Sequence, residues 1–338
     1  MKYVYMFICL LLFLATSVKA EIQYLGVGTH IKNYNDPDKL LQSITELGVN
    51  SIRDDINWDD VEIHKGIFTD EKIKPIVKAV ESLNTIGVKP IIILSFTNTN
   101  YNQGKPIESA NDLEAYSRYV AYIVDLLKGK VLFYEIGNEW TRNANVENVN
   151  KNAIQYLSLI EMASKTIRNK DNDARILFGS LNLAAPQGKY FKESELSWLK
   201  ILLENGVMKF TDGISIHAYS LFDNPGIRDP ASYFRYVDLT LSQLHKVFPG
   251  DLKIYITETG IYSKEYIFGK SDKFIKDYIN SYMNEANKRG YIKGIWWYDL
   301  KDDGSDPYNK EHHFGIFDKN FQFKEYTSTF INSLERVK

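Results

Sequence analysis

An alternation of short apolar segments with amphipathic stretches runs through almost the whole chain and most constrains its fold. Eight apolar segments have the length and composition of β-strands, and they begin near Tyr24, Ser51, Lys89, Val131, Arg175, Gly213, Lys253 and Lys293. After each one, apolar residues recur at three- and four-residue spacing, which predicts helices over residues 36–47, 70–86, 111–127, 148–167, 193–204, 229–247, 271–289 and 324–335. Eight strand–helix units are the number in a closed α/β barrel, so we predict a (β/α)8 TIM barrel.

An open, doubly wound α/β sheet is the alternative, because it uses the same alternation. That fold carries a Gly-rich phosphate turn after its first strand, and this chain shows none there. The length of 338 residues allows one large domain or two small ones. No Pro/Ser-rich linker or charge block divides the chain, so we expect residues 21–338 to form one domain.

The first 20 residues have the pattern of a secretory signal peptide. An apolar run from Val4 to Ala15 is followed by Val18 and Ala20 at the positions that precede a cleavage site. The run is shorter than the roughly 20 residues that span a bilayer, so a retained membrane anchor is disfavoured. Cys9, the only cysteine, would leave with the peptide, and no disulfide could support the fold. We therefore expect a secreted or periplasmic protein without a membrane span after cleavage.

Charge and aromatic content limit the classes of molecule that the protein could bind. The 41 basic and 43 acidic residues give a formal net charge of −2, so nothing basic attracts nucleic acid. Aromatic residues make up 14% of the chain, with 23 tyrosines. Such side chains suit either the stacking of a flat, hydrated ligand or the packing of a core. We expect a monomer that binds no nucleic acid.

The fourth candidate strand ends in polar residues that suggest a site. Residues 131–140 read Val-Leu-Phe-Tyr-Glu-Ile-Gly-Asn-Glu-Trp, in which Gly137 allows a turn before Asn138, Glu139 and Trp140. Alternatively, Asn138 and Glu139 only cap the next helix. A partner elsewhere in the chain has to distinguish these two interpretations.

Polar and aromatic residues follow most of the other strands as well. The active site of a TIM barrel lies at the carboxyl ends of its strands, where this chain places His30, Arg53, Trp58, Phe96, Asn138, Glu139, His217, Tyr219, Glu258, Trp297 and Asp299. Each residue has a structural alternative. Arg53 could pair with Asp55, His217 could be a hydrogen-bonded core histidine, and either Trp58 or Trp297 could be plain core. A chance gathering of all of them at one end is much harder to explain.

Two carboxylic acids in this set face each other across the predicted barrel mouth. A carboxylate pair is the equipment for breaking a glycosidic bond. Either Glu139 or Glu258 would protonate the departing oxygen, while the other attacks the sugar carbon or activates water. Arg53 beside the second acid would hold it ionised at neutral pH.

The remaining residues suit a sugar ligand. Trp297 would stack on the apolar face of a sugar ring, and Asn138 and His217 can bond hydroxyl groups. With Arg53, these form the expected substrate-binding set, together with His30, Trp58 and Tyr219. This chemistry requires neither metal nor cofactor. The acidic loop at residues 299–306 could suggest calcium, but its spacing does not match the EF-hand loop, so we expect a solvated loop facing the substrate.

Three motifs resemble the retaining glycoside hydrolases of clan A, which share this barrel. They are Gly-Asn-Glu-Trp at 137–140, Ile-His-Ala-Tyr at 216–219 and Thr-Glu-Thr-Gly at 257–260. The resemblance implies that Glu139 is the acid/base and Glu258 the nucleophile. Residues 52–62, 295–304 and 313–315 look most like family 39 and its bacterial exopolysaccharide-degrading relatives. Two departures are Asn-Glu-Trp, where many members have Asn-Glu-Pro, and a chain too short for the extra β-sandwich domain of some family 39 enzymes.

The predicted function is hydrolysis of O-glycosidic bonds in a poly- or oligosaccharide by double displacement. A carbohydrate-binding pseudoenzyme on the same barrel is one alternative. It would keep Trp58, Trp297 and Tyr219 but would need neither carboxylate. Another barrel enzyme, such as a lyase or aldolase, would require a lysine or metal ligands at the strand ends, and the sequence shows neither there. The presence of both Glu139 and Glu258 favours catalysis.

Overall fold

The computed structural model describes residues 22–34, 36–143, 147–181, 193–220 and 229–337. Within them, eight parallel strands close into a barrel in the order β1-β10-β9-β8-β7-β6-β5-β2. The strands are β1 (Tyr24–Gly28), β2 (Ser51–Ile56), β5 (Lys89–Leu94), β6 (Phe133–Ile136), β7 (Arg175–Leu181), β8 (Gly213–His217), β9 (Ile254–Thr259) and β10 (Ile292–Trp297). The predicted TIM barrel is confirmed. The predicted signal peptide, residues 1–20, lies outside the described residues.

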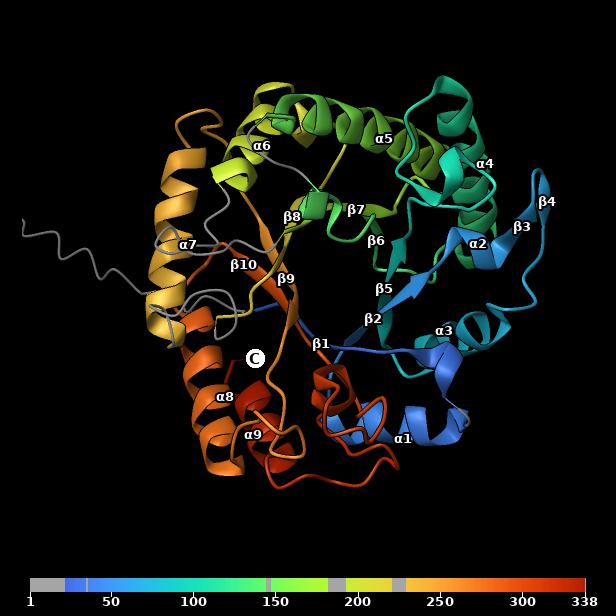
Figure 1. The fold of residues 1–338 in the computed structure, drawn as a ribbon. Helices are drawn as coiled ribbons and strands as arrows, with labels where there is room; N and C mark the ends of the chain where they lie inside the picture. The colour runs from blue at the N-terminus through green and yellow to red at the C-terminus, as the bar shows by residue number, and fades with distance from the viewer. Residues whose placement is uncertain (1–21, 35, 144–146, 182–192, 221–228, 338) are drawn as a thin grey trace, which may run out of the picture.

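Helices surround the barrel (Figure 1). They are α1 (Pro37–Leu47), α2 (Trp58–Val61), α3 (Lys74–Thr85), α4 (Ala110–Leu127), α5 (Val149–Lys170), α6 (Glu193–Glu204), α7 (Pro230–Leu244), α8 (Asp272–Asn287) and α9 (Thr327–Val337). Side-chain caps explain several helix starts. Asp36 accepts a hydrogen bond from the Lys39 backbone amide, and Ser109 and Asp112 form a capping box. Among the described helices, none combines the length and apolarity required to cross a membrane.

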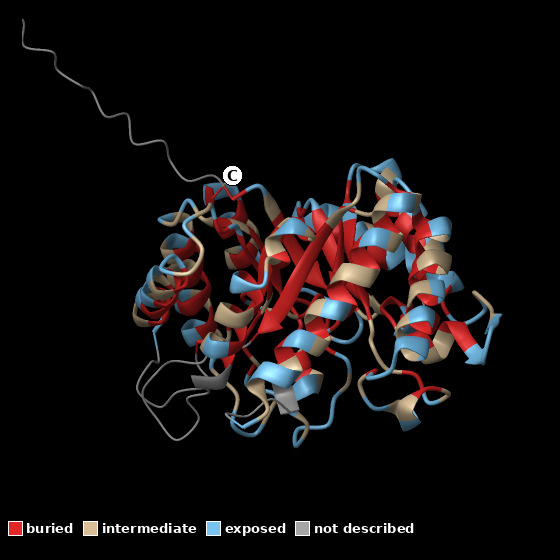
Figure 2. Cartoon of the chain, turned by 90° about the horizontal axis from the view of Figure 1, so that it is seen from above, coloured by how far each residue is buried: buried red, intermediate tan, exposed pale blue. Residues whose placement is uncertain are grey.

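Burial separates the two faces of each helix (Figure 2). The strands and the inward helix faces are buried, whereas the outward faces are exposed. This arrangement follows from the three- and four-residue spacing of apolar side chains, which forms one stripe on each helix. The main core therefore lies between the barrel and its helices.

A second buried cluster fills part of the barrel interior. It contains Phe133, Tyr255 and Trp296, with Tyr24 packed against it. A Cβ atom at Gly26 would collide with the Trp296 indole, so glycine is needed for this ring to lie across the interior. The Trp296 Nε1 atom donates to the Ser51 hydroxyl at 3.0 Å. Because aromatic rings fill this part of the interior, polar chemistry is left to the carboxyl ends of the strands.

A short hairpin that the sequence did not predict follows α2. It consists of β3 (Glu62–His64) and β4 (Ile67–Phe68), paired antiparallel. The buried Glu62 carboxylate holds it in place by accepting from Trp58 Nε1 at 2.6 Å and from the Gly66 amide at 2.6 Å. A buried carboxylate requires such donors because desolvation is costly.

Candidate active site

Arg53 lies at the centre of the polar groups at the barrel mouth. It projects from β2 and is almost completely buried. Its Nε atom donates to Glu135 Oε2 at 2.6 Å, Nη1 to Glu258 Oε1 at 2.6 Å and Nη2 to Asn138 Oδ1 at 2.9 Å. A planar guanidinium fixes several acceptors at once. Arg53 therefore ties together the ends of β2, β6 and β9. It does not pair with Asp55.

Glu139 and Glu258 face each other with His217 between them. The His217 Nδ1 atom lies 3.0 Å from Glu139 Oε1 and 3.4 Å from Glu258 Oε2. One carboxylate oxygen of each glutamate and a nitrogen of His217 all lie within 4.8 Å of one another. The side chain of Glu139 is 26% exposed and that of Glu258 is 14% exposed, so a ligand can reach both from the barrel mouth.

Tyr219 completes the surroundings of Glu258. Its hydroxyl donates to Glu258 Oε2 at 2.9 Å. Burial, together with the negative charge of Glu258, raises the pKa of the Tyr219 hydroxyl well above its ordinary value. The hydroxyl therefore keeps its proton at neutral pH. Both oxygens of Glu258 are thus held, one by Arg53 and the other by Tyr219.

Glu135 is a site residue that the sequence reasoning missed. It is fully buried in β6, and its Oε1 atom accepts from Ser180 Oγ at 2.8 Å and from Thr257 Oγ1 at 2.9 Å. Burial alone would raise the pKa of Glu135, but the Arg53 guanidinium lowers it below its ordinary value. Its signal in the sequence was a glutamate in the middle of an otherwise apolar strand.

A left-handed turn places the Glu139 carboxyl group. Gly137 has φ of +75° and Glu139 has φ of +48°, and a non-glycine residue in this region is uncommon outside functional sites. A Cβ atom at Gly137 would lie 2.7 Å from the Phe96 ring. Phe96 in turn packs on Trp140, with ring centroids 4.6 Å apart. The turn predicted at Gly137 is therefore present, and the packed rings of Phe96 and Trp140 lie against it.

Two tryptophans expected to bind substrate lie elsewhere, which corrects those two assignments. Trp58 is completely buried, donates to Glu62 and stacks on Tyr101 with centroids 4.9 Å apart. Trp297 is also buried and packs on Phe330 of α9, at 5.7 Å. Side chains alternate along β10, so Trp297 points outward to the helices while Trp296 faces the barrel interior. Neither indole can offer a face to a sugar.

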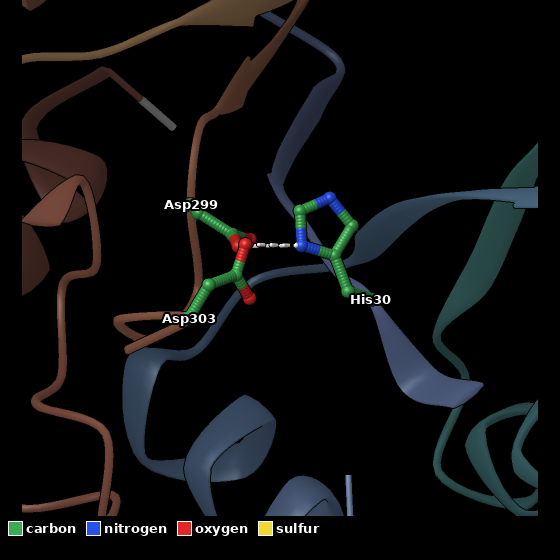
Figure 3. A group of neighbouring side chains, drawn as sticks. All are labelled: His30, Asp299 and Asp303. Carbon is green, nitrogen blue, oxygen red and sulfur yellow. Dashed lines mark ion pairs between the residues drawn. The ribbon is translucent and has the colours of Figure 1, made fainter. Parts of the chain in front are cut away.

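His30 lies at the mouth, with two acids from the loop after β10 (Figure 3). Its Nδ1 atom is 2.8 Å from Asp303 Oδ2 and 3.3 Å from Asp299 Oδ2. Burial alone would lower the pKa of His30, but Asp299 and Asp303 raise it to about 10. His30 is therefore a cation at neutral pH. Its ring also meets Tyr298 edge-on, with centroids 5.7 Å apart.

The loop at residues 299–306 is only partly solvated. Asp302 is buried and pairs with Lys324 at 2.6 Å, which corrects the expectation of a solvated loop at this position. Among the described residues, two groups offer three donors of the kind that bind metals, namely His30 with Asp299 and Asp303, and His217 with Glu139 and Glu258. The ion pairs of His30 account for the geometry of the first group, and the contacts of His217 Nδ1 with the two glutamates account for that of the second.

The comparisons with known proteins identify the family. The model of glycosyl hydrolase family 10 matches residues 14–333. The chain belongs to this family. Together with the barrel, the match confirms the predicted resemblance to clan A. No curated protein matches the sequence.

Solved structures show the same fold at low sequence identity. A family 39 glycoside hydrolase from Bacteroides cellulosilyticus WH2 superposes with a TM-score of 0.72 at 23% identity, covering 94% of this chain and 64% of that one. Xylanase 10B from Thermotoga maritima gives 0.64 at 16% identity, covering 93% and 95%. GH5_18 from Streptomyces cattleya, in complex with GlcNAc, gives 0.71 at 11% identity, covering 94% and 81%. The likeness to family 39 is therefore one of fold, and the chain spans under two thirds of that structure's length.

Proposed function

We propose that the chain is a secreted or periplasmic retaining glycosidase in which Glu258 is the nucleophile and Glu139 the acid/base. The observation that carries the proposal is the pair of carboxylate oxygens within 4.8 Å of each other. Retaining pairs stand about 5 to 5.5 Å apart, whereas inverting pairs stand about 6.5 to 9.5 Å apart to admit a water molecule. The spacing here supports direct attack on the sugar.

In the first step, Glu258 attacks the anomeric carbon while Glu139 gives its proton to the departing oxygen. Arg53 and Tyr219 hold the Glu258 oxygens at 2.6 and 2.9 Å, which fixes the carboxylate before the substrate arrives. The bond to the leaving sugar breaks as the ester to Glu258 forms. Glu139 is left as a carboxylate.

His217 contacts both acids through a single ring nitrogen, Nδ1. Its Nε2 atom lies 3.4 Å from Arg53 Nη2, which can only donate, so Nε2 is the acceptor and Nδ1 carries the hydrogen. Nδ1 then donates toward Glu139 at 3.0 Å and lies 3.4 Å from Glu258. This favours a fixed orientation of Glu139 when it is charged, which is its state after the first step.

In the second step, the Glu139 carboxylate takes a proton from water, whose oxygen attacks the same anomeric carbon. The ester bond breaks, Glu258 regains its charge and Glu139 regains its proton. Two inversions leave the sugar with its original configuration.

We further propose a β-linked poly- or oligosaccharide substrate for an exported monomer. Similar structures include the xylanase 10B above and an exo-β-1,4-mannosidase, Op5Man5, from Opitutaceae bacterium strain TAV5. Support for export comes from the signal-peptide pattern in residues 1–20.

The test uses purified protein that comprises residues 21–338. Its substrates are β-1,4-xylan, β-1,4-mannan, mixed β-glucans and the matching aryl β-glycosides, and the measurement is hydrolysis. Proton NMR of the first product formed reports its anomer before mutarotation. We expect release of the β-anomer from at least one substrate and none from the Glu258→Gln variant. Release of the α-anomer would reject the retaining mechanism.

A further inference from the structure

Arg53 is shared between two carboxylates, one that faces the barrel mouth and one that is fully buried. Its Nη1 atom donates to Glu258 Oε1 and its Nε atom to Glu135 Oε2, both at 2.6 Å. The side chain of Glu258 is 14% exposed, whereas that of Glu135 is completely buried. One positive charge therefore meets two negative charges, and the attraction that Arg53 exerts on Glu258 is opposed by the repulsion from Glu135.

Glu135 is held as an anion. Its other oxygen, Oε1, accepts from Ser180 Oγ at 2.8 Å and from Thr257 Oγ1 at 2.9 Å. Burial opposes the charged form of Glu135, but Arg53 holds its pKa below the ordinary value. The negative charge is therefore present throughout the pH range in which a carboxylate nucleophile works.

The same hydrogen bonds fix Glu135 against the backbone that carries both catalytic acids. Thr257 precedes Glu258 in β9, and Ser180 Oγ lies 3.2 Å from the Gly137 carbonyl, in the turn that places the acid/base. Ser180 has φ of +47°, a region in which a non-glycine residue persists only where the surrounding structure imposes it. The charge of Glu135 therefore stays at one place relative to Arg53.

The other ionisable groups near the two carboxylates are tyrosines, His217 and Glu139. Burial raises the pKa of each tyrosine above its ordinary value, so all of them remain neutral: Tyr156 near Glu135, and Tyr219 and Tyr298 near Glu258. His217 Nδ1 lies 3.4 Å from Glu258 and also contacts Glu139. Arg53 is thus the fixed charge in contact with Glu258, and Glu135 is the fixed charge in contact with Arg53.

Building on the proposed function, we propose that Glu135 is a positioning residue that sets the nucleophilicity of Glu258 through Arg53. A carboxylate that faces an uncompensated arginine is a weak base and therefore a weak nucleophile. Because Glu135 offsets part of the Arg53 charge, Glu258 is oriented by the guanidinium and still basic enough to attack the anomeric carbon. Glu135 is completely buried and acts only through Arg53.

The variant Glu135→Gln tests this role, because it removes the charge and keeps the shape. Its amide group can donate to the hydroxyls of Ser180 and Thr257, which also accept, and its oxygen can face Arg53. We expect the acid limb of the pH profile of kcat/KM, which reports protonation of the nucleophile, to move to lower pH by about one unit. The plateau of kcat/KM on an aryl β-glycoside should fall about threefold or more, because Glu258 becomes a weaker nucleophile.

The direction of the shift separates a charge effect from a structural one. If Glu135 only kept Arg53 in place, its replacement would release Arg53 from Glu258, and the acid limb would move to higher pH. If Glu135 served stability alone, the acid limb would not move. Either result overturns the inference.

Glu62→Gln is the matched control. Glu62 is also completely buried, and its carboxylate accepts from Trp58 Nε1 at 2.6 Å and from the Tyr101 hydroxyl at 2.5 Å. The same substitution there should lower the thermal midpoint and leave the acid limb at its wild-type position. An equal downward shift in this control would contradict the role assigned to Glu135.

Glu135→Asp decides the question if Glu135→Gln does not fold. The shorter side chain keeps the negative charge but sets it further from Arg53, so Glu258 receives more of the guanidinium's attraction. The acid limb should therefore move in the same direction, to lower pH, by a smaller amount than a neutral side chain would cause. An acid limb that is unchanged or lies at higher pH in this variant rejects the inference.

Trapping of the glycosyl-enzyme provides a second measurement. The reagent is an activated 2-deoxy-2-fluoro-β-glycoside of the sugar that the wild type hydrolyses. Its reaction with Glu135→Gln should be slower than with the wild type, whereas recovery of activity after its removal should be faster, because a less basic carboxylate attacks more slowly and departs more readily. Slowing of both steps would indicate a general defect and would contradict the inference. The proposed function fails separately, if the wild type forms no covalent adduct at Glu258.

Discussion

Arg53 connects stability and chemistry at the level of single residues. It compensates the fully buried Glu135 and also fixes Glu258. We expect Arg53→Met to lower the free energy of unfolding by about 3 to 5 kcal/mol, because Glu135 is left as an uncompensated buried charge. Turnover should fall more than about tenfold, because Glu258 loses a fixed cation. Chemical denaturation and steady-state kinetics measure the two effects.

The double variant Arg53→Met/Glu135→Gln separates these two roles. Removal of the buried charge should restore much of the stability, whereas turnover should stay low. Recovery of full turnover with stability would show that Arg53 acts only through Glu135.

The two acids have distinct roles that azide can distinguish. In Glu258→Gly, azide should fill the gap and attack an activated β-glycoside once, which gives an α-glycosyl azide. In Glu139→Ala, the glycosyl-enzyme should still form from a substrate that needs no acid catalysis, and azide should intercept it to give the β-glycosyl azide. NMR of the two products reads the configuration. The same anomer from both variants would contradict the assigned roles.

Among the structural elements, the turn after β6 decides where Glu139 points. Gly137 has φ of +75°, and a side chain there would also press on Phe96. We expect Gly137→Ala to cost about 1 to 3 kcal/mol and to lower turnover as the turn shifts. Thermal unfolding and kinetics on an aryl glycoside measure these effects.

Gly87 provides the matched control for that turn. It has φ of +79°, but a Cβ atom there would meet nothing within 4 Å. Gly87→Ala should therefore cost about 1 kcal/mol through backbone strain and leave turnover unchanged. An equal loss of turnover in both variants would mean that the effect at Gly137 is general destabilisation.

At the scale of the whole molecule, the barrel closes where β1 meets β10, and His30 with Asp299 and Asp303 bridges the ends of these strands. The folded-state pKa of His30, about 10, exceeds its ordinary 6.5. Burial raises the pKa of Asp299 to about 8, so at pH 6.5 the charged partner of His30 is Asp303. The stabilisation that His30 gains from this pair is therefore present at pH 6.5 and is lost as the pH rises through about 10. His30→Gln should lower the thermal midpoint by several degrees at pH 6.5, or about 2 kcal/mol, and by much less at pH 10.5.

The exposed His245 is the control for this pH dependence. His245→Gln should leave the thermal midpoint within about a degree of the wild type at both pH values. The ring is exposed, and within the described part of the chain its one hydrogen bond is to the Phe248 carbonyl, at 3.3 Å. If the difference in thermal midpoint between His30→Gln and the wild type were the same at pH 6.5 and pH 10.5, the effect would come from packing and not from charge.

Much of the architecture was predictable from local patterns. The predicted strand starts agree with the observed ones within two residues, and the observed helices overlap all eight predicted ranges. Period-two and period-3.6 patterns arise from contacts within each element, so they are visible without the fold. The hairpin of β3 and β4 was missed, because its strands are too short to show a period.

Sequence by itself determined that Glu139 and Glu258 end strands of one barrel, since their motifs follow strands and parallel strands end at the same face. Only the tertiary structure decided which neighbour of the Trp296–Trp297 pair faces inward and that Arg53 holds Glu135. Because side chains alternate along a strand, one of the two tryptophans must face inward and the other outward. Which one faces inward depends on the register with which the barrel closes. Arg53 and Glu135 lie 82 positions apart, so no local pattern records their pairing. Long-range partners are chosen by closure of the whole sheet, after local preferences have been satisfied.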